Sequence, residues 1–191
     1  MNRKTLDKMV SYLGLALAGL LVVAGYLAYT GYSFADTSVT EQLAQQNINF
    51  PTTDTAPVAG EGGFTQADID ALAPFIGTSL TTGDGAKAYA DHYIAVHMAG
   101  IGGGKTYSEI SGAYMAALAS DPTAPETAAL GQQRMTMFMG DTLRGLLLEG
   151  YAFWSIGQIA LIASYACYVG AVVMFLLALF GFRHAKAVET A

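Results

Sequence analysis

The chain has 191 residues, of which 53% are hydrophobic and only 13% are charged, and its mean hydropathy is +0.38. Soluble domains carry about 25% charged residues, so this composition argues against a soluble globular protein. The formal net charge of −6 argues against a nucleic-acid partner, because phosphates attract clustered lysine and arginine. The single cysteine excludes an intrachain disulfide framework and a zinc site built from several cysteines.

The first apolar segment lies near the N-terminus. No residue from 9 to 35 is charged, and a helix over 10–32 would be about 34 Å long, which is enough to cross a bilayer. The Ser-Phe-Ala sequence at 33–35 fits a signal-peptide cleavage site, but the apolar core of a signal peptide has only about 7 to 15 residues. We therefore expect an uncleaved membrane anchor, with a cleavable signal peptide as the alternative.

The second apolar segment lies near the C-terminus. It is uncharged from 150 to 182, which exceeds the thickness of one bilayer, so it tilts or begins outside the hydrocarbon. Basic residues beside a span stay on the cytoplasmic side. They precede the first segment and follow the second: Arg3, Lys4, Lys8, Arg183 and Lys186.

Residues 36–149 contain four basic and thirteen acidic side chains, a net charge of 4 − 13 = −9. The charge distribution therefore predicts a plasma (inner) membrane protein with both termini in the cytoplasm and residues 36–149 extracytoplasmic. The predicted parts are a cytoplasmic tail over 1–8, a transmembrane helix over 9–35, an extracytoplasmic domain over 36–152, a second transmembrane helix over 153–182 and a cytoplasmic tail over 183–191.

Cap signals divide the segment between the spans into helices. The first predicted helix begins at the capping box Ser38-x-x-Glu41 and runs through Gln46, and the second covers 66–72, between the cap Thr65 and Pro74. A third covers 85–99 and ends at Gly100, and a fourth begins at the capping box Thr106-x-x-Glu109 and runs through Ala119. The fifth begins near Thr123, Pro125 and Glu126 and continues into the second span. No strand-like alternation occurs outside the spans. The predicted class is an all-α membrane protein, with two transmembrane helices flanking a small helical extracytoplasmic domain.

A glycine-rich segment over 99–106 matches a permissive phosphate-loop pattern. A phosphate loop follows a strand, whereas a helix is predicted before this segment. We interpret it as a linker between two helices, with Lys105 solvated and Thr106 as a helix cap. Nucleotide binding is not expected.

The two histidines of the outer segment are His92 and His97. On one helix they would point about 140° apart, whereas a metal-binding pair needs a spacing of three or four residues. We expect His92 to pack and His97 to bond a backbone carbonyl. Cys167 lies in the middle of the second apolar segment, where a small packing residue is expected. No catalytic, cofactor-binding or metal-ligating residue is assigned.

The possible interaction residues are polar side chains of the outer segment: Asp141, Arg144, Glu149, His97 and Arg134. Asp141 and Arg144 lie one helical turn apart and can form an ion pair near the lipid headgroups. In the alternative, Arg144 binds a partner protein or a lipid phosphate while Glu149 faces the first helix.

Small residues recur in both spans at four-residue spacing, which lets helix backbones approach closely. They are Gly14 with Ala18, Ala24 with Ala28, Ala160 with Ser164, and Ala163, Cys167 and Ala171. Two interpretations remain open: the spans pack on each other, or they dock against another membrane subunit.

Several short motifs resemble a family of actinobacterial two-span membrane proteins of unassigned function. They are Gln42-Leu43-Ala44-Gln45, Ile48-Asn49-Phe50-Pro51, Tyr93-Ile94 with His97, Lys105-Thr106-Tyr107, Gln133-Arg134 and Phe138 through Leu148. Some members carry the label "aromatic ring-opening dioxygenase, LigA-like", which implies non-haem iron held by two histidines and a carboxylate. Only His92, His97 and the distant Glu109 could be nominated for those roles, and the resemblance transfers no catalytic residue.

The sequence thus favours a non-enzymatic accessory or scaffold subunit. Its expected partners are the lipid bilayer and either another membrane protein or further copies of the chain, and no cofactor is expected. The alternative is a lipid-binding or small-ligand-binding module, or an enzyme, with a site near His92 and His97.

Overall fold

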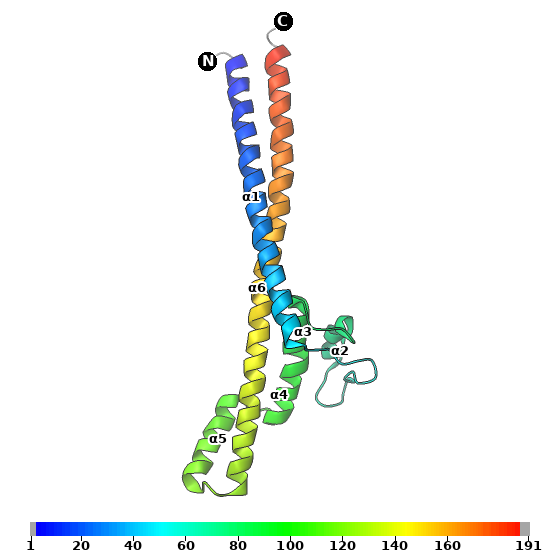
Figure 1. Cartoon of the computed structure of the whole chain (residues 1–191), viewed down its shortest axis with the longest axis vertical. Helices are drawn as coiled ribbons and strands as arrows, with labels where there is room; N and C mark the ends of the chain where they lie inside the picture. The colour runs from blue at the N-terminus through cyan, green and yellow to red at the C-terminus, as the bar shows by residue number, and fades with distance from the viewer. Residues whose placement is uncertain (1–2, 188–191) are drawn as a thin grey trace. The chain divides into compact units, whose positions relative to one another are not determined.

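The computed structural model describes residues 3–187 and is all-helical, with 82% of the described residues in helices and no strand among them. The all-α prediction is therefore confirmed. The chain divides into two compact units, Met1–Asp36 with Ser155–Ala191 (unit 1) and Thr37–Trp154 (unit 2). Figure 1 shows the helices of both units.

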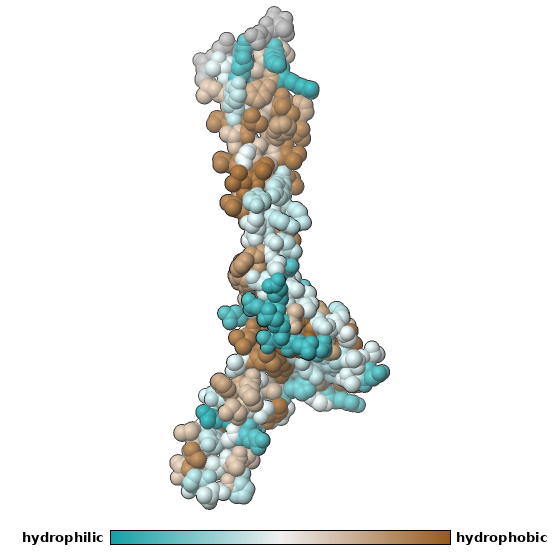
Figure 2. Space-filling model, viewed as in Figure 1, coloured by the Kyte–Doolittle hydropathy of each residue, from teal (hydrophilic) through white to brown (hydrophobic). Residues whose placement is uncertain are grey.

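Unit 1 is an antiparallel pair formed by the N-terminal part of α1 (Arg3–Gln46) and the C-terminal part of α6 (Pro125–Ala187) (Figure 1). Both helices are long and apolar enough to cross a membrane. Hydrophobic side chains cover much of the exposed surface of this pair below its hydrophilic end (Figure 2). Only 22% of the most apolar window of α1 and 11% of that of α6 is buried, so most of their apolar surface faces outward.

The two helices of unit 1 meet along a seam with alternating steps of three and four residues. The seam positions are Ser11, Gly14, Ala18, Leu21, Gly25, Ala28, Tyr32 and Ala35 on α1, and Gly157, Ala160, Ser164, Cys167, Ala171, Met174, Ala178, Gly181 and Ala185 on α6, all buried or half-buried. This spacing is the heptad pattern of a left-handed coiled coil. Most of the side chains are small, which allows the backbones to approach closely.

Direct contacts across the seam confirm this close approach. A methyl group added at Gly157 would lie 2.9 Å from the Cβ atom of Ala35, and one at Gly14 would lie 3.5 Å from that of Ala178. The Ser164 hydroxyl, which is fully buried, donates to the backbone carbonyl of Gly25 at 2.8 Å.

Most of the small residues singled out in the sequence therefore pack the two helices on each other: Gly14, Ala18, Ala28, Ala160, Ser164, Cys167 and Ala171. Ala24 and Ala163 differ, because both are exposed on the outward faces of their helices.

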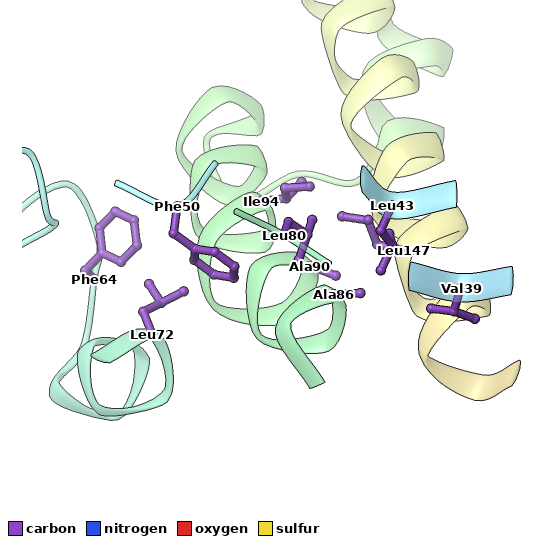
Figure 3. Packing of buried hydrophobic residues seen from close by; sticks show 10 residues of the cluster. All are labelled: Val39, Leu43, Phe50, Phe64, Leu72, Leu80, Ala86, Ala90, Ile94 and Leu147. Carbon is purple, nitrogen blue, oxygen red and sulfur yellow. The ribbon is translucent and has the colours of Figure 1, made fainter. Parts of the chain in front are cut away.

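Unit 2 has a core of larger side chains, drawn in Figure 3: Val39, Leu43, Phe50, Phe64, Leu72, Leu80, Ala86, Ala90, Ile94 and Leu147. Val39 and Leu43 of α1 lie beside Leu147 of α6 in this cluster (Figure 3). The end of α1 is therefore part of the unit 2 core.

The short helices of unit 2 begin where the cap signals predict. Thr65 caps α2 (Gln66–Leu72), which continues as the 3₁₀ turn η1 (Ala73–Phe75), with Pro74 in its first turn. Thr106 caps α5 (Tyr107–Ser120) and forms the expected capping box with Glu109. Both cap predictions are confirmed. They could be made from the sequence because a capping box satisfies backbone donors within one helical turn and needs no distant partner.

The predicted break after the first span is wrong, since α1 runs without interruption to Gln46 and contains Ser38 and Glu41 in its interior. Ala35, Val39 and Leu43 are buried on one face, so tertiary packing continues the helix through the capping-box pattern. The helix ends before Asn47, whose φ of 49° is left-handed.

The predicted helix over 85–99 has a different internal structure. It consists of α3 (Gly83–Tyr89), a π-helical turn η2 (Ala90–Ile94) and α4 (Ala95–Gly102). It ends at Gly102 rather than at Gly100, and the residue that caps it is Gly103, whose φ of 58° is left-handed. The final helix, α6, begins at Pro125 and continues through the second apolar segment, as predicted. Thr123 does not cap α6, because its backbone N–H and hydroxyl donate to the Asp121 carboxylate instead.

Candidate functional site

A row of packed aromatic rings runs along the π-helical turn and the helical residues on either side of it. Tyr89 and Tyr93 have ring centroids 4.8 Å apart, and those of Tyr93 and His97 are 4.5 Å apart. Phe64 meets His97 edge-on at 5.5 Å, and His97 Nδ1 lies 2.8 Å from the backbone carbonyl of Tyr93. His97 is thus held by aromatic packing and by a carbonyl, as its place near the helix end predicts.

His92 has a different partner. Its Nδ1 atom lies 2.8 Å from the Asp68 carboxylate on α2, and this contact joins α2 to the π-helical turn. Hydrogen bonds from the Thr65 hydroxyl, from His92 and from the Thr65 backbone N–H lower the pKa of Asp68 to about 2. Asp68 is not among the residues expected from the sequence, although it stands three residues after the cap Thr65, where a capping-box partner belongs.

The structure does not gather the residue types of an iron site. Glu109 is bonded to Thr106, whereas His92 pairs with Asp68 and His97 with Tyr93. Within residues 3–187, no three histidine, cysteine or carboxylate side chains lie close enough to hold a metal ion.

Arg144 is the centre of a charged cluster, but its partner differs from the predicted one. It donates to Asp91 at 3.0 Å rather than pairing with Asp141, and Lys87 binds the other carboxylate oxygen of Asp91. Burial raises the pKa of Asp91, but the hydrogen bonds from Lys87 and Arg144 outweigh it and lower that pKa overall. Arg144 and Asp91 are 53 residues apart, so no local pattern reveals the pair.

A cavity of about 430 Å³ lies between α4, the glycine-rich linker and α6, and we call it the α4–α6 cavity. Its lining is partly apolar, with Met98 and Met137, and partly charged, with Lys105, Asp141 and Arg144. The Nε atom of Arg144 is buried and makes no hydrogen bond.

Arg134 lies between α5 and α6. Its Nε atom donates to the Ser111 hydroxyl at 3.0 Å, and its guanidinium lies 5.3 Å from the ring of Tyr114 and 6.0 Å from that of Tyr107. This cation–π packing fastens the two helices together. Arg134 therefore contacts Ser111, Tyr107 and Tyr114, whereas His92 and His97 have other partners.

A second hollow, which we call the α1–α6 groove, has a volume of about 510 Å³. It is lined by Val39, Gln42, Leu43 and Gln46 of α1 and by Leu143, Leu146, Leu147, Glu149, Gly150 and Phe153 of α6. Of the predicted interaction residues, Glu149 lies here, on the side of α6 that faces α1, whereas Asp141 and Arg144 line the α4–α6 cavity.

Apolar side chains also lie exposed on the part of α6 that belongs to unit 2. They form a stripe with helical spacing, which we call the α6 stripe: Met135, Phe138, Met139, Leu143, Leu146 and Phe153. From the sequence, only a helix that leads into the second span is predicted here. The three- and four-residue spacing of Met135, Met139, Leu143 and Leu146 is the signal that could have identified the stripe.

Comparison with known proteins gave no match to a family model, to a curated protein or to a solved structure.

Proposed function

We propose that this chain is a membrane-anchored accessory or scaffold subunit whose helical unit 2 docks with another component of the membrane or envelope. The observation that carries the proposal is the α6 stripe, an exposed apolar surface on unit 2. Contiguous exposed apolar patches mark surfaces that bind other molecules.

The outward surface of unit 1 supports the membrane anchor. Its exposed side chains are large and apolar, among them Leu20, Val23, Ile159 and Ile162. A bilayer solvates such a surface, whereas water does not. The basic residues at both chain ends favour cytoplasmic termini, and the acidic balance of 36–149 favours an extracytoplasmic unit 2.

Purification tests the docking proposal. The full-length tagged chain is extracted from its own membranes in a gentle detergent, and the mass of the particle is measured by native mass spectrometry. We expect a stable complex heavier than the 20.0 kDa chain that contains a second protein in fixed ratio. Recovery of the chain alone, with only lipid and detergent, would contradict the proposal.

Cysteine labelling tests the topology. In a Cys167→Ser background, a cysteine at the exposed Thr53 should react with a membrane-impermeant reagent in intact cells, and one at the exposed Thr5 should react only after the cells are opened. The reverse pattern would overturn the orientation while leaving the docking proposal to be judged on its own test.

A further inference from the structure

The α1–α6 groove has the composition of a protein-binding site. Its floor consists of Val39, Leu43 and Leu147, which are buried core residues, and its walls include the exposed Leu146 and Phe153. Between them, Gly150 leaves the surface open, since a methyl group added there would meet no atom within 4 Å. A glycine in a helix face allows another backbone to approach closely.

The rim of the groove is polar. Gln42 and Gln46 stand one turn apart on α1, and Glu149 stands opposite on α6. All three side chains are exposed, so their polar groups can reach an incoming chain. An apolar centre with a polar rim is the usual anatomy of a protein–protein interface.

The length of the groove matches about two to three turns of a helix. The lining spans residues 39–46 of α1 and 143–153 of α6, which correspond to about 10 Å and about 15 Å of helix, or two to three turns. A partner helix inserted between them would place apolar side chains at i, i+3, i+4 and i+7 on the floor, as in other helix-in-groove complexes.

Charge decides between the candidate occupants. Glu149 and the net charge of −9 over 36–149 repel a lipid phosphate. They also disfavour a second copy of this chain, because a two-fold contact would bring the same acidic surfaces together. A partner that carries lysine or arginine beside its apolar face would be attracted instead.

We propose that the α1–α6 groove is the docking site for a helix of another protein, with an apolar face on Val39, Leu43, Leu147 and Gly150 and a basic residue opposite Glu149. This inference rests on the proposed docking function and names the surface and the chemistry of the partner.

Site-specific photocrosslinking in native membranes tests the assignment. A photoreactive residue replaces Leu146 in the groove wall, and a second chain carries it at Met115, an exposed position of α5 outside the groove. From Leu146 we expect a crosslink to a different protein. Introducing Gly150→Phe, which fills the groove, should lower its yield at least about tenfold, and Glu149→Lys should also lower it.

Gly112→Phe is the matched control, because Gly112, like Gly150, lies in a helix with no atom within 4 Å of an added methyl group. It should leave the crosslink unchanged. Circular dichroism and thermal unfolding establish that each variant folds. If Gly150→Phe fails to fold, the decision passes to Glu149→Lys, whose loss should be reversed by an acidic-for-basic exchange in the identified partner.

Three outcomes overturn the groove assignment: a Leu146 adduct with a lipid, a Leu146 adduct with a second copy of the chain, or a protein crosslink that survives both substitutions. A partner captured from Met115 but not from Leu146 would also overturn it and leave the docking function standing. If neither position captures a protein and the chain purifies alone, the docking function fails as well.

Discussion

The two units of this chain differ in the side chains that they bury. In unit 1 the buried positions are mostly glycine, alanine and serine, while leucine, valine, isoleucine and phenylalanine face outward. In unit 2 the buried core also contains large side chains, such as Phe50, Leu72 and Leu80, and the surface includes capped helices and ion pairs.

If unit 1 lies in a bilayer as proposed, different forces hold the two units together. Burial of apolar surface away from water stabilises unit 2. Between helices in lipid that driving force is absent, and close packing of small residues and interhelical hydrogen bonds replace it. The same substitution should therefore have different consequences in the two units.

The largest difference is expected for truncation of leucine. Leu80 is 1% exposed in unit 2, and Leu80→Ala should reduce the free energy of unfolding by about 2–5 kcal/mol, because it leaves a cavity. Leu20 is 66% exposed in unit 1, and Leu20→Ala should change it by less than about 0.5 kcal/mol. Hydrogen exchange of the full chain in vesicles measures both, and equal losses would remove the contrast.

Enlargement of a seam glycine should give the converse result. Gly157→Leu would press against Ala35 and separate α1 from α6, at a cost of about 1–3 kcal/mol. Gly19→Leu is the matched control, because Gly19 is exposed with no atom within 4 Å of an added methyl group. Steric trapping in vesicles reports the free energy of separating the helices. A tolerated Gly157→Leu would show that the seam is not closely packed.

Acid should weaken unit 2 through Asp68. Its pKa falls from 3.8 to about 2 on folding, so the ionised carboxylate stabilises the folded state above the unfolded pKa. That stability should be lost progressively as pH falls from about 4 to about 2. Asp68→Asn should reduce this pH dependence, as followed by thermal unfolding at each pH. An unchanged pH profile would contradict the role of the Thr65–Asp68–His92 contacts.

The smallest expected effect concerns the buried hydrogen bond across the seam. Ser164→Ala removes the bond to the Gly25 carbonyl and should cost about 0.6 kcal/mol, typical of interhelical hydrogen bonds in membranes. The same steric-trapping measurement applies, with Ser155→Ala at the edge of unit 1 as the control. A loss of several kcal/mol would mean that polar bonding, rather than close packing, holds the seam.

Features with local causes could be predicted from the sequence. The caps at Thr65 and Thr106 lie where expected because their partners are three residues away. The capping-box pattern at Ser38 failed because the unit 2 core, which Val39 and Leu43 enter, favours a continuous helix.

Features with distant causes could not be predicted. The Arg144–Asp91 pair and the α1–α6 groove depend on which helices meet, and residue spacing within one helix does not specify that. The π-helical turn over 90–94 likewise has no signal in the periodicity that predicted its helix.

The central claim is that the outward face of unit 1 contacts lipid. A spin label at Leu20, which is 66% exposed, tests it in vesicles in a Cys167→Ser background. The label should be accessible to oxygen, which dissolves in the bilayer, and inaccessible to a water-soluble nickel complex. Accessibility of the Leu20 label to the nickel complex would contradict the claim.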